Sequence, residues 1–584
     1  MDTKNSNTNN FIIITMIILA AFRIYLGKAV GNWMYIWETD DMLMIRYSLL
    51  MQHFTSPNIF SMVKTIAFSL FILFIRLLNI DYSTAVSLLW VIASLSSYIL
   101  LKRITGSKII PLISYIYFLF LPIAFEQSII RLYRNGILAP LTITIFCILF
   151  VFLSSIIKNT HKYIKLIITS VVLSMVFIFF YYIKEDGIWL AVSIFAFCSL
   201  TGIAIVIKAI QKKISAKQMT IYILCLVLPF VLLKTADELY REINYKYFGV
   251  REIQTRTSGE LGKFVSYIYT VDSPEQNYRY WTTKDQIMAV YNASHTLQQH
   301  PEILQVIFNK NVYPGSRDEN YNIKGDFFTW ILREALNASG LWKSESYVNN
   351  LFKQVNSEIQ IAFDSGKLKT SDKIYLSHAA VGRTLREILD LIPLVLANIK
   401  DAITLSGYNP GPHIMKLSDY AAQKARLAVA MTGLYYISDY TLRSKTEMKA
   451  VNHIVKWDIK AYKYINVILA FITIFSFFYI IKILVNNCIK EKDFKDIKEY
   501  TTSIQLLVCI MLLCGIAFCY SFAINWFASF DYLNNLKIYI IRARYYTPPL
   551  PGIIGVIYFL SVANLYLTRK LTHRENIKHT DQAC

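Results

Sequence analysis

Two adjacent aspartates and a nearby arginine follow the first long apolar run of the chain, in the stretch "WETDDMLMIRY" at residues 37–47. Asp40 and Asp41 form the pair, and Arg46 comes shortly after it. A carboxylate can take the proton from an attacking hydroxyl group. A guanidinium forms charge-assisted hydrogen bonds to phosphate oxygens. These residue types therefore suit acid–base chemistry on a substrate that carries a phosphate.

More acids and cations occur where later apolar runs end. The acids are Glu126, Glu185 and Asp186, and the cations are Arg131, Arg134, Lys184, Arg542 and Arg544. If all of them lie on one face of a membrane, the cations can hold a lipid-borne phosphate and stabilise the negative charge that develops as it departs. The elements between them must then be membrane helices that bring these ends to the same face.

The composition is that of a polytopic membrane protein. Of the 584 residues, 55% are hydrophobic and only 17% are charged, whereas an ordinary soluble domain is about 25% charged. A spanning helix needs about 20 apolar residues. The predicted spans are 11–27, 84–101, 109–125, 138–157, 166–183, 188–207, 218–235, 463–481, 503–527 and 550–567. The first is expected to be a retained helix because no small-residue cleavage site follows it.

One more apolar run, 64–80, is predicted to lie in the membrane interface instead of crossing the bilayer. It carries Lys64 and Arg76, which a span surrounded by lipid would resist. Counting it as a span would also place basic linkers such as "LLKRITGSK" outside, although such linkers tend to be cytoplasmic. We therefore expect a multi-pass protein of the cell (plasma) membrane with both termini in the cytoplasm.

This topology divides the chain into three parts. Residues 1–237 form a seven-helix transmembrane module with the outer loop 28–83, residues 238–460 form an extracytoplasmic domain, and residues 461–584 form the C-terminal transmembrane helices and a cytoplasmic tail. Helix-period stretches such as "TLREILDLIPLVLANI" predict that the domain is mostly helical. The expected fold class is an all-α polytopic membrane protein, with about ten transmembrane helices and an interfacial helix.

The net charge of +21 comes from the short linkers between apolar runs, while 238–460 is nearly neutral. The lipid bilayer is therefore an expected partner, and nucleic acid is not. None of the 8 cysteines lies in 238–460, so the sequence indicates neither a disulfide framework nor a zinc knuckle. The histidines have no ligand spacing. No cofactor or metal ligand is predicted, and a divalent metal is compatible with the sequence without being indicated by it.

Several of these stretches resemble the C-superfamily (GT-C) glycosyltransferases. "TDDMLMIRYSLL" looks like the first-loop signature of that family, "IKEDGIWL" resembles its basic–acid–Gly turn after the fifth span, and "RARYYTPPLPGII" resembles its Arg-Tyr-Pro entry into a late span. The resemblance covers the first 235 residues as a pattern and returns at 542–552. The chain lacks the aromatic-rich tripeptide of the oligosaccharyltransferases, and the large domain after the seventh span is placed as in the protein O-mannosyltransferases; the arabinofuranosyltransferases are similar.

This resemblance implies an enzyme that transfers a hexose or pentose, with inversion, from a polyprenyl-phosphate carrier to an acceptor hydroxyl on the outer face of the membrane. The acceptor would be a glycan, a lipid or a protein, and a metal would be optional. The residues that match the family's site are Asp40 or Asp41 as the catalytic acid, Glu126, Arg131 and Arg134 in the second loop, and Lys184, Arg542 or Arg544 at the lipid phosphate, with Glu185 and Asp186 as supporting acids. Asp40 is the preferred base.

Each pattern also has a simpler interpretation. The aspartate pair can cap a helix, and "KEDG" at 184–187 can be a polar turn between two spans. Arg542 and Arg544 can anchor the chain at the membrane boundary beside two tyrosines. In these interpretations the charged residues have no role in catalysis.

Other functions would use some of the same residues. A polymerase or ligase of lipid-linked glycans would share the outer arginines but would not need the aspartate pair. A lipid or glycan transporter places ionisable residues inside its spans, whereas the predicted spans of this chain are almost free of charge, with Arg23 as the exception away from their ends. A receptor that binds through 238–460 would leave the other outer loops unexplained.

Overall fold

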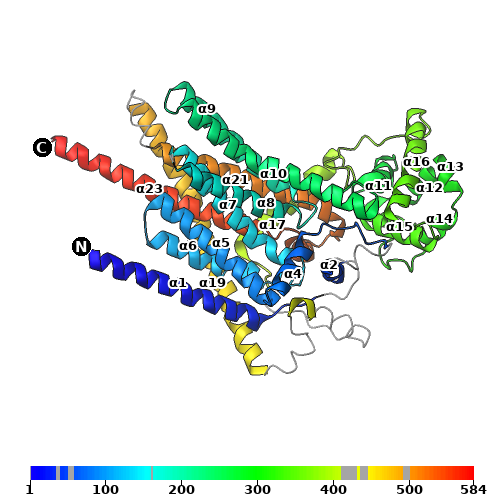
Figure 1. The fold of residues 1–584 in the computed structure, drawn as a ribbon, viewed down its shortest axis with the longest axis horizontal. Coiled ribbons are helices and arrows are strands. Elements are labelled where there is room, and N and C mark those ends of the chain that lie inside the picture. Colours follow the sequence, from blue (N-terminus) through cyan, green and yellow to red (C-terminus); the bar gives the residue numbers. More distant parts are fainter. Residues whose placement is uncertain are drawn as a thin grey trace.

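The described chain is built almost entirely of helices, which confirms the predicted all-α membrane fold (Figure 1). A computed structural model describes residues 2–34, 40–49, 58–159, 162–409, 430–433, 445–490 and 500–583. Within these residues, nine helices are long and apolar enough to cross a membrane. They are α1 (Asp2–Val30), α5 (Tyr82–Thr105), α7 (Asn135–Ile157), α8 (Tyr163–Tyr181), α9 (Ile188–Ile210), α10 (Ala216–Phe248), α19 (Lys445–Lys490), α21 (Thr501–Ala528) and α23 (Leu550–Ala583). Each contains one of the predicted spans or most of it.

Two apolar helices are shorter. The predicted span 109–125 is divided into α6 (Ile109–Leu119) and the 3₁₀ helix η1 (Pro122–Phe125), where Pro122 lacks the N–H that a continuous helix would use. The predicted interfacial run contains α4 (Ala67–Leu77), which has 11 residues. At about 1.5 Å per residue, α4 reaches across about half of the roughly 30 Å hydrocarbon layer. Its length agrees with a helix that does not cross the bilayer.

Helix α7 is the centre of the bundle. Of its apolar window, 89% is buried, compared with 22% for α1. It packs against α5, α8, α9 and α23. Because α7 begins directly after Arg134, the segment before it enters the bundle at a fixed place on the surface.

The local sequence explains where several helices begin and end. The Asp81 side chain accepts a hydrogen bond from the Thr84 backbone at the start of α5, and Gly106 ends that helix in the left-handed conformation. Ser215 and Gln218 form a capping box at the start of α10. These residues satisfy backbone groups that a helix end leaves without partners.

The outer domain follows α10 and lies beyond one end of the bundle (Figure 1). Its elements are α11 (Gly259–Thr270), β1 (Tyr280–Thr282), α12 (Lys284–Ala293), α13 (His295–Gln298), α14 (Glu302–Ile307), β2 (Ile323–Lys324), α15 (Phe327–Ala338) and α16 (Glu345–Asp364). The two strands pair in an antiparallel manner. The domain docks on the end of α21, where the Trp281 ring contacts the Phe527 ring at 5.1 Å between centroids.

A later helix of the predicted extracytoplasmic range returns to the bundle. Helix α17 (Leu385–Thr404) starts at a capping box of Thr384 and Glu387. It packs against α21, α19 and the short helix α22 (Leu536–Tyr546). Helix α17 therefore belongs with the membrane helices, while the compact outer domain ends before it.

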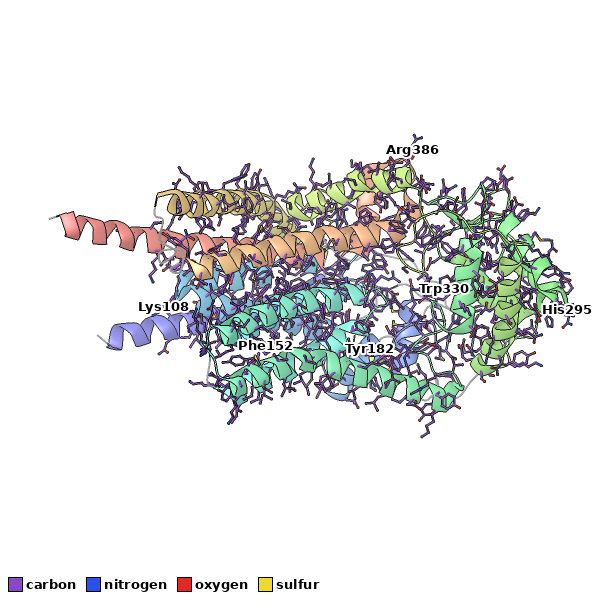
Figure 2. All side chains as sticks on the ribbon, turned by 90° about the horizontal axis from the view of Figure 1, so that it is seen from above. Lys108, Phe152, Tyr182, His295, Trp330 and Arg386 are labelled. Atoms are coloured by element: carbon purple, nitrogen blue, oxygen red, sulfur yellow. The ribbon has the colours of Figure 1, made fainter. Side chains whose placement is uncertain are left out.

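Both chain ends lie at the end of the bundle opposite the outer domain (Figure 1). Figure 2 places Lys108, in the turn between α5 and α6, toward that same end, and His295 at the far tip of the outer domain. Trp330 lies between the bundle and the outer domain in this view. The predicted topology needs both termini and this basic turn on one side, and the fold allows it.

Candidate active site

The side chains of the aspartate pair have different surroundings. Asp40 directly precedes the short helix α2 (Asp41–Ser48), and Asp41 is its first residue. The Asp41 side chain is fully buried, whereas 36% of the Asp40 side chain is exposed. Asp40 is thus the carboxylate of the pair that a substrate can reach.

Arg131 holds both aspartates. Its Nη2 lies 3.1 Å from Asp40 Oδ2 and 2.6 Å from Asp41 Oδ1, and its Nε donates to Asp41 Oδ2 at 2.9 Å. The backbone brings it there, because the Leu132 N–H donates to the Trp33 carbonyl at 2.7 Å. The predicted meeting of the first and second outer loops therefore occurs at Arg131.

Lys64 and Tyr133 complete the surroundings of Asp40, and the sequence did not assign them to the site. The Lys64 Nζ donates to Asp40 Oδ1 and, at 2.8 Å, to Tyr133 Oη. Only 3% of the Lys64 side chain is exposed. In the sequence, the position of Lys64 in an apolar run indicated that 64–80 lies in the membrane interface. It did not indicate that Lys64 contacts Asp40.

These contacts change the proton affinities of both groups. Burial raises the pKa of Asp40, but Lys64 and Arg131 lower it by more, so that it lies well below its usual range. Burial lowers the pKa of the Lys64 ammonium to about 8, despite the opposing effect of Asp40. At neutral pH, Asp40 is therefore an ionised carboxylate and Lys64 is still a cation.

A second ion pair, between Arg134 and Glu185, adjoins the residues that contact Asp40. Arg134 donates through Nη1 to both Glu185 oxygens at 2.9 Å, and its Nη2 donates to Tyr133 Oη at 2.7 Å. Burial raises the pKa of Glu185, but Arg134, Arg256 and Lys64 bring it down to about 2. Arg134 and Glu185 thus orient the tyrosine that contacts Lys64 and Asp40.

The turn after α8 carries a further cation, Lys184. Lys184 pairs with Asp186 at 2.9 Å, and its Nζ donates to the Tyr546 carbonyl at 3.5 Å. Its side chain is 16% exposed. Lys184 and Asp186 are therefore linked to the residues around Asp40 through the end of α22, which also carries Tyr545.

The end of α22 contributes an aromatic wall. Tyr545 Oη accepts a hydrogen bond from Arg131 Nη1 at 3.0 Å. The Tyr545 ring stacks on the Tyr133 ring, with the centroids 6.4 Å apart and the planes 9° apart. The Arg131 guanidinium lies 4.7 Å from the centroid of the Tyr133 ring. The two tyrosines therefore fix the guanidinium by stacking as well as by hydrogen bonding.

Arg544 and Glu126 lie in a different cluster. Arg544 Nε pairs with Asp401 Oδ2 at 3.0 Å, and its Nη1 pairs with Glu126 Oε1 at 3.1 Å. All three side chains are almost completely buried. Burial raises the pKa of Glu126, although Arg544 opposes this effect. Arg544 thus ties α22 to α17 and to the second outer loop, and leaves Tyr545 facing Arg131.

Arg542 is separate from both clusters. It pairs with Asp531 at 2.8 Å, and 47% of its side chain is exposed. Asp531 ends the 3₁₀ helix η3 (Ser529–Asp531). Arg542 therefore faces water at the rim, beside the junction with the outer domain.

The outer domain holds the segment that carries Lys64. The Arg333 guanidinium donates to the Ile59 carbonyl, and the Thr255 N–H donates to the Met62 carbonyl at 2.7 Å. On the opposite side, Tyr47 Oη accepts from the Val63 N–H at 3.3 Å. The position of Lys64 therefore depends on the outer domain as well as on the membrane helices.

Among the residues that the structure describes, no group of three or more His, Cys, Asp or Glu side chains could hold a metal ion. The charges around Asp40 are instead paired with lysine and arginine. Such a site can bind an anion and hold a proton acceptor.

Comparisons with protein-family models, with curated proteins and with solved structures find no match for this chain.

Proposed function

We propose that the chain is a membrane glycosyltransferase that moves a hexose or pentose from a polyprenyl-phosphate carrier to an acceptor hydroxyl at the outer face of the membrane. The observation that supports this best is Asp40, a partly exposed carboxylate held by Lys64 and Arg131 where the bundle meets the outer domain. One carboxylate next to two cations provides a proton acceptor and a phosphate site within the same few ångströms.

The reaction is a single displacement. The acceptor oxygen attacks the anomeric carbon, the bond from that carbon to the phosphate oxygen breaks, and the phosphate leaves with the electron pair. The acceptor proton goes to Asp40. An incoming phosphate competes with Asp40 for Lys64 and Arg131, and this raises the basicity of Asp40 once the donor is bound. The cations then stabilise the departing phosphate.

The remaining charged residues have supporting roles in this proposal. Asp41 fixes Arg131, while Arg134 and Glu185 fix Tyr133. Lys184 would contact the phosphate from the other edge of the site. Arg544 holds α22 in position through its two buried acids.

The test uses the full-length protein in lipid nanodiscs. Polyprenyl-phosphate mannose, glucose and arabinose are offered with mixed saccharide, lipid and peptide acceptors, and sugar transfer is measured by mass spectrometry. We expect transfer from one of these donors by the wild type and its loss in Asp40→Asn. Normal transfer by Asp40→Asn overturns the assignment of the base.

A transporter is the second candidate, because an arginine and an aspartate on two membrane-length helices lie near each other. Arg23 of α1 is 1% exposed, and Asp458 of α19 is close enough to interact with it electrostatically. Ionisable residues inside spans are typical of transport pathways. Movement of the labelled donor across a vesicle membrane without any sugar transfer would favour this function over the transferase.

A further inference from the structure

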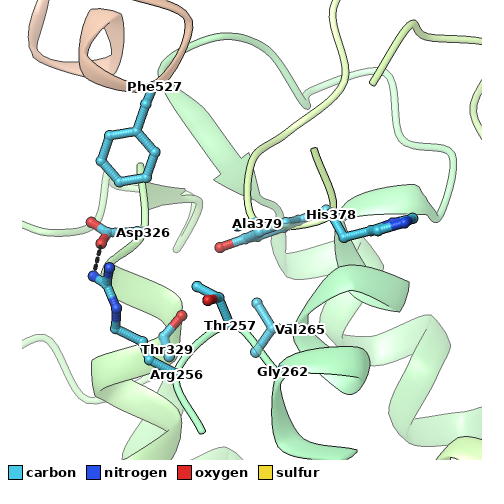
Figure 3. Close-up of a pocket in the computed structure, with 10 residues that line it drawn as sticks. Arg256, Thr257, Gly262, Val265, Asp326, Thr329, His378, Ala379 and Phe527 are labelled. Carbon is cyan, nitrogen blue, oxygen red and sulfur yellow. Dashed lines mark hydrogen bonds and ion pairs between the residues drawn. The ribbon is translucent and has the colours of Figure 1, made fainter. Parts of the chain in front are cut away.

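Arg23 of α1 is a buried cation that the proposed reaction does not use, and only 1% of it is exposed. An ionised side chain inside a membrane helix is costly, so its position requires a reason. Arg256, which lines a recess between the outer domain and α21, is paired with Asp326 at 3.0 Å (Figure 3). Arg23 instead donates through Nη1 to a hydroxyl group, Ser87 Oγ of α5, at 3.2 Å. The Arg23 guanidinium is thus engaged with α5.

Hydrogen bonds continue from Ser87 toward the outer end of α5. Ser87 Oγ donates to the Ser83 carbonyl at 2.8 Å, and Ser83 Oγ donates to Asn32 Oδ1 at 2.6 Å. A serine hydroxyl has one hydrogen. Ser87 therefore gives its hydrogen to Ser83 and accepts from Arg23, which fixes the direction of every bond from Arg23 to Asn32.

Helices α1 and α5 approach each other closely at this place. A Cβ at Gly27 would clash with Ser87 Oγ and would lie 2.8 Å from Arg23 Nη1. Glycine at position 27 therefore leaves the space in which the arginine meets the serine. Gly31, with a φ of 75°, then ends α1, and its N–H donates to the Gly27 carbonyl at 3.1 Å. Asn32 follows directly after this turn.

Asn32 and Trp33 hold the second outer loop on both sides of Arg131. Asn32 Nδ2 donates to the Ile130 carbonyl at 2.6 Å. The Leu132 N–H donates to the Trp33 carbonyl at 2.7 Å. Ile130 and Leu132 are the chain neighbours of Arg131, so these two bonds fix the backbone from which the Arg131 side chain extends.

The amide of Asn32 suits this place because it has both a donor and an acceptor. The Ile130 carbonyl only accepts and requires the amide NH₂, while the Ser83 hydroxyl donates and requires the amide oxygen. Asn32 is 9% exposed, so water has little access to replace it. A leucine has a similar size but would leave both groups without a partner, which is costly in a buried place.

We propose that Asn32 is a positioning residue for Arg131, and that Arg23, Ser87 and Ser83 brace Asn32 from within the membrane. This role rests on the proposed function and adds the residues that set the place of the guanidinium. Arg131 Nη2 reaches Asp40 and Asp41 at once, at 3.1 and 2.6 Å. A shift of its backbone would break this double contact, and a misplacement of about 1 Å can lower a rate about 10²-fold.

Hydrogen–deuterium exchange of the full-length protein in lipid nanodiscs measures the contact without any substrate. The Leu132 N–H, which donates to Trp33, reports whether the loop is held. We expect Asn32→Leu and Ser87→Ala each to speed the exchange of this N–H about tenfold, because each removes a buried hydrogen bond that supports it.

Ser96→Ala is the matched control. Ser96 lies on the same helix but is exposed, and its hydroxyl donates within α5 to the Ile92 carbonyl at 2.8 Å. Exchange of the Leu132 N–H should stay the same in this variant. Thermal midpoints check folding, and Ser87→Ala, which removes a single oxygen atom, keeps the test valid if Asn32→Leu fails to fold. Unchanged exchange in the variants that fold overturns the proposal.

Sugar transfer tests the consequence for Arg131. A variant that merely folds less well contains less active enzyme and keeps its donor KM. A displaced Arg131 holds the donor phosphate less well, so the donor KM should rise about tenfold in Asn32→Leu and in Ser87→Ala, and should not change in Ser96→Ala. Faster exchange with an unchanged donor KM overturns the positioning role. Absence of transfer by the wild type refutes the transferase instead, and exchange alone then decides whether Asn32 holds the loop.

Discussion

Asp40 and Asp41 are neighbours in the sequence, but burial gives them different tasks. Asp41 accepts two contacts from Arg131 and has no exposed surface. Asp40 shares the same arginine, yet more than a third of its side chain is exposed. A group without exposed surface cannot meet a substrate, so Asp41 positions the guanidinium and Asp40 meets the acceptor.

This difference predicts opposite behaviour of two isosteric variants. Asp40→Asn should lower sugar transfer about 10² to 10⁴-fold with little change in the thermal midpoint. Asp41→Asn should cost about 3–5 kcal/mol of stability, because it leaves the buried Arg131 poorly compensated. Transfer rates and thermal unfolding of both variants in nanodiscs provide the check. Equal loss of stability in both variants would contradict the assigned roles.

Lys64 gives the site a limit at alkaline pH. Its pKa falls from 10.5 in the unfolded chain to about 8 in the folded protein, chiefly through burial. Between these pH values the unfolded state binds more protons than the native state, so deprotonation of Lys64 makes stability increase with pH. The cation is lost over the same range, and transfer should therefore fall above pH 8 by about tenfold per pH unit.

The variant Lys64→Arg tests this directly, since arginine keeps its charge throughout the range. A pH profile of transfer should lose its alkaline limb in this variant, while Lys64→Met should be inactive at every pH. An unchanged alkaline limb in Lys64→Arg would assign the titration to another group.

The sequence predicted part of this site and missed the rest for a physical reason. Asp40, Asp41 and Arg131 could be identified because charges at the ends of apolar runs are a local feature. Tyr545 lies 414 positions from the arginine that it contacts, and no local pattern marks such a partner. Arg544 shows the opposite case: its residue type suits phosphate binding, but Asp401 and Glu126 occupy it.

The segment 58–66 is the element on which the site depends most, because it is held by its backbone and not by its own secondary structure. Arg333 of α15 supports it through the Ile59 carbonyl and also lies 3.7 Å from Glu345. Arg333 has no exposed side-chain surface. Arg333 is therefore a positioning residue that acts on Lys64 through the chain between them.

Arg333→Met should destabilise the outer domain by about 3–5 kcal/mol, since it removes the buried partner of Glu345. The double variant Arg333→Met with Glu345→Gln should recover part of this loss, because no unpaired charge remains. Both variants should shift the alkaline limb of the transfer profile, because the surroundings of Lys64 change. Thermal midpoints and pH profiles measure the two effects separately, and an unshifted limb would show that Arg333 has only a structural role.

The sequence predicted the membrane helices where the hydropathy pattern is continuous. It did not predict which part of the protein a helix packs against where tertiary contacts determine this. Nine of the ten predicted spans are long helices, but Pro122 follows a break in 109–125. Helix α17 was predicted to belong to the outer domain because it lies within the hydrophilic range 238–460. Its buried Asn398 and Asp401 instead bind partners on α21 and α22, and the sequence alone does not reveal such partners.

The overall arrangement separates two ends of the protein. The outer domain and the Asp40 cluster lie at one end of the bundle, and both termini lie at the other (Figure 1). The basic turn between α5 and α6 lies toward the end with the termini, as shown by the position of Lys108 (Figure 2). The positive-inside tendency predicts that this end is cytoplasmic, and hence that the proposed chemistry takes place outside the cytoplasm.

Cysteine labelling tests this orientation. In a variant without the 8 native cysteines, Ser365→Cys places a thiol at the exposed end of α16, and Ser107→Cys places one in the turn between α5 and α6. The two changes are chemically identical, so accessibility alone distinguishes them. A membrane-impermeant maleimide should label Ser365→Cys in intact cells, whereas Ser107→Cys should react only after the membrane is permeabilised. Labelling of Ser107→Cys in intact cells would place the basic turn outside and the Asp40 cluster on the cytoplasmic face, which would contradict the proposed transfer at the outer face.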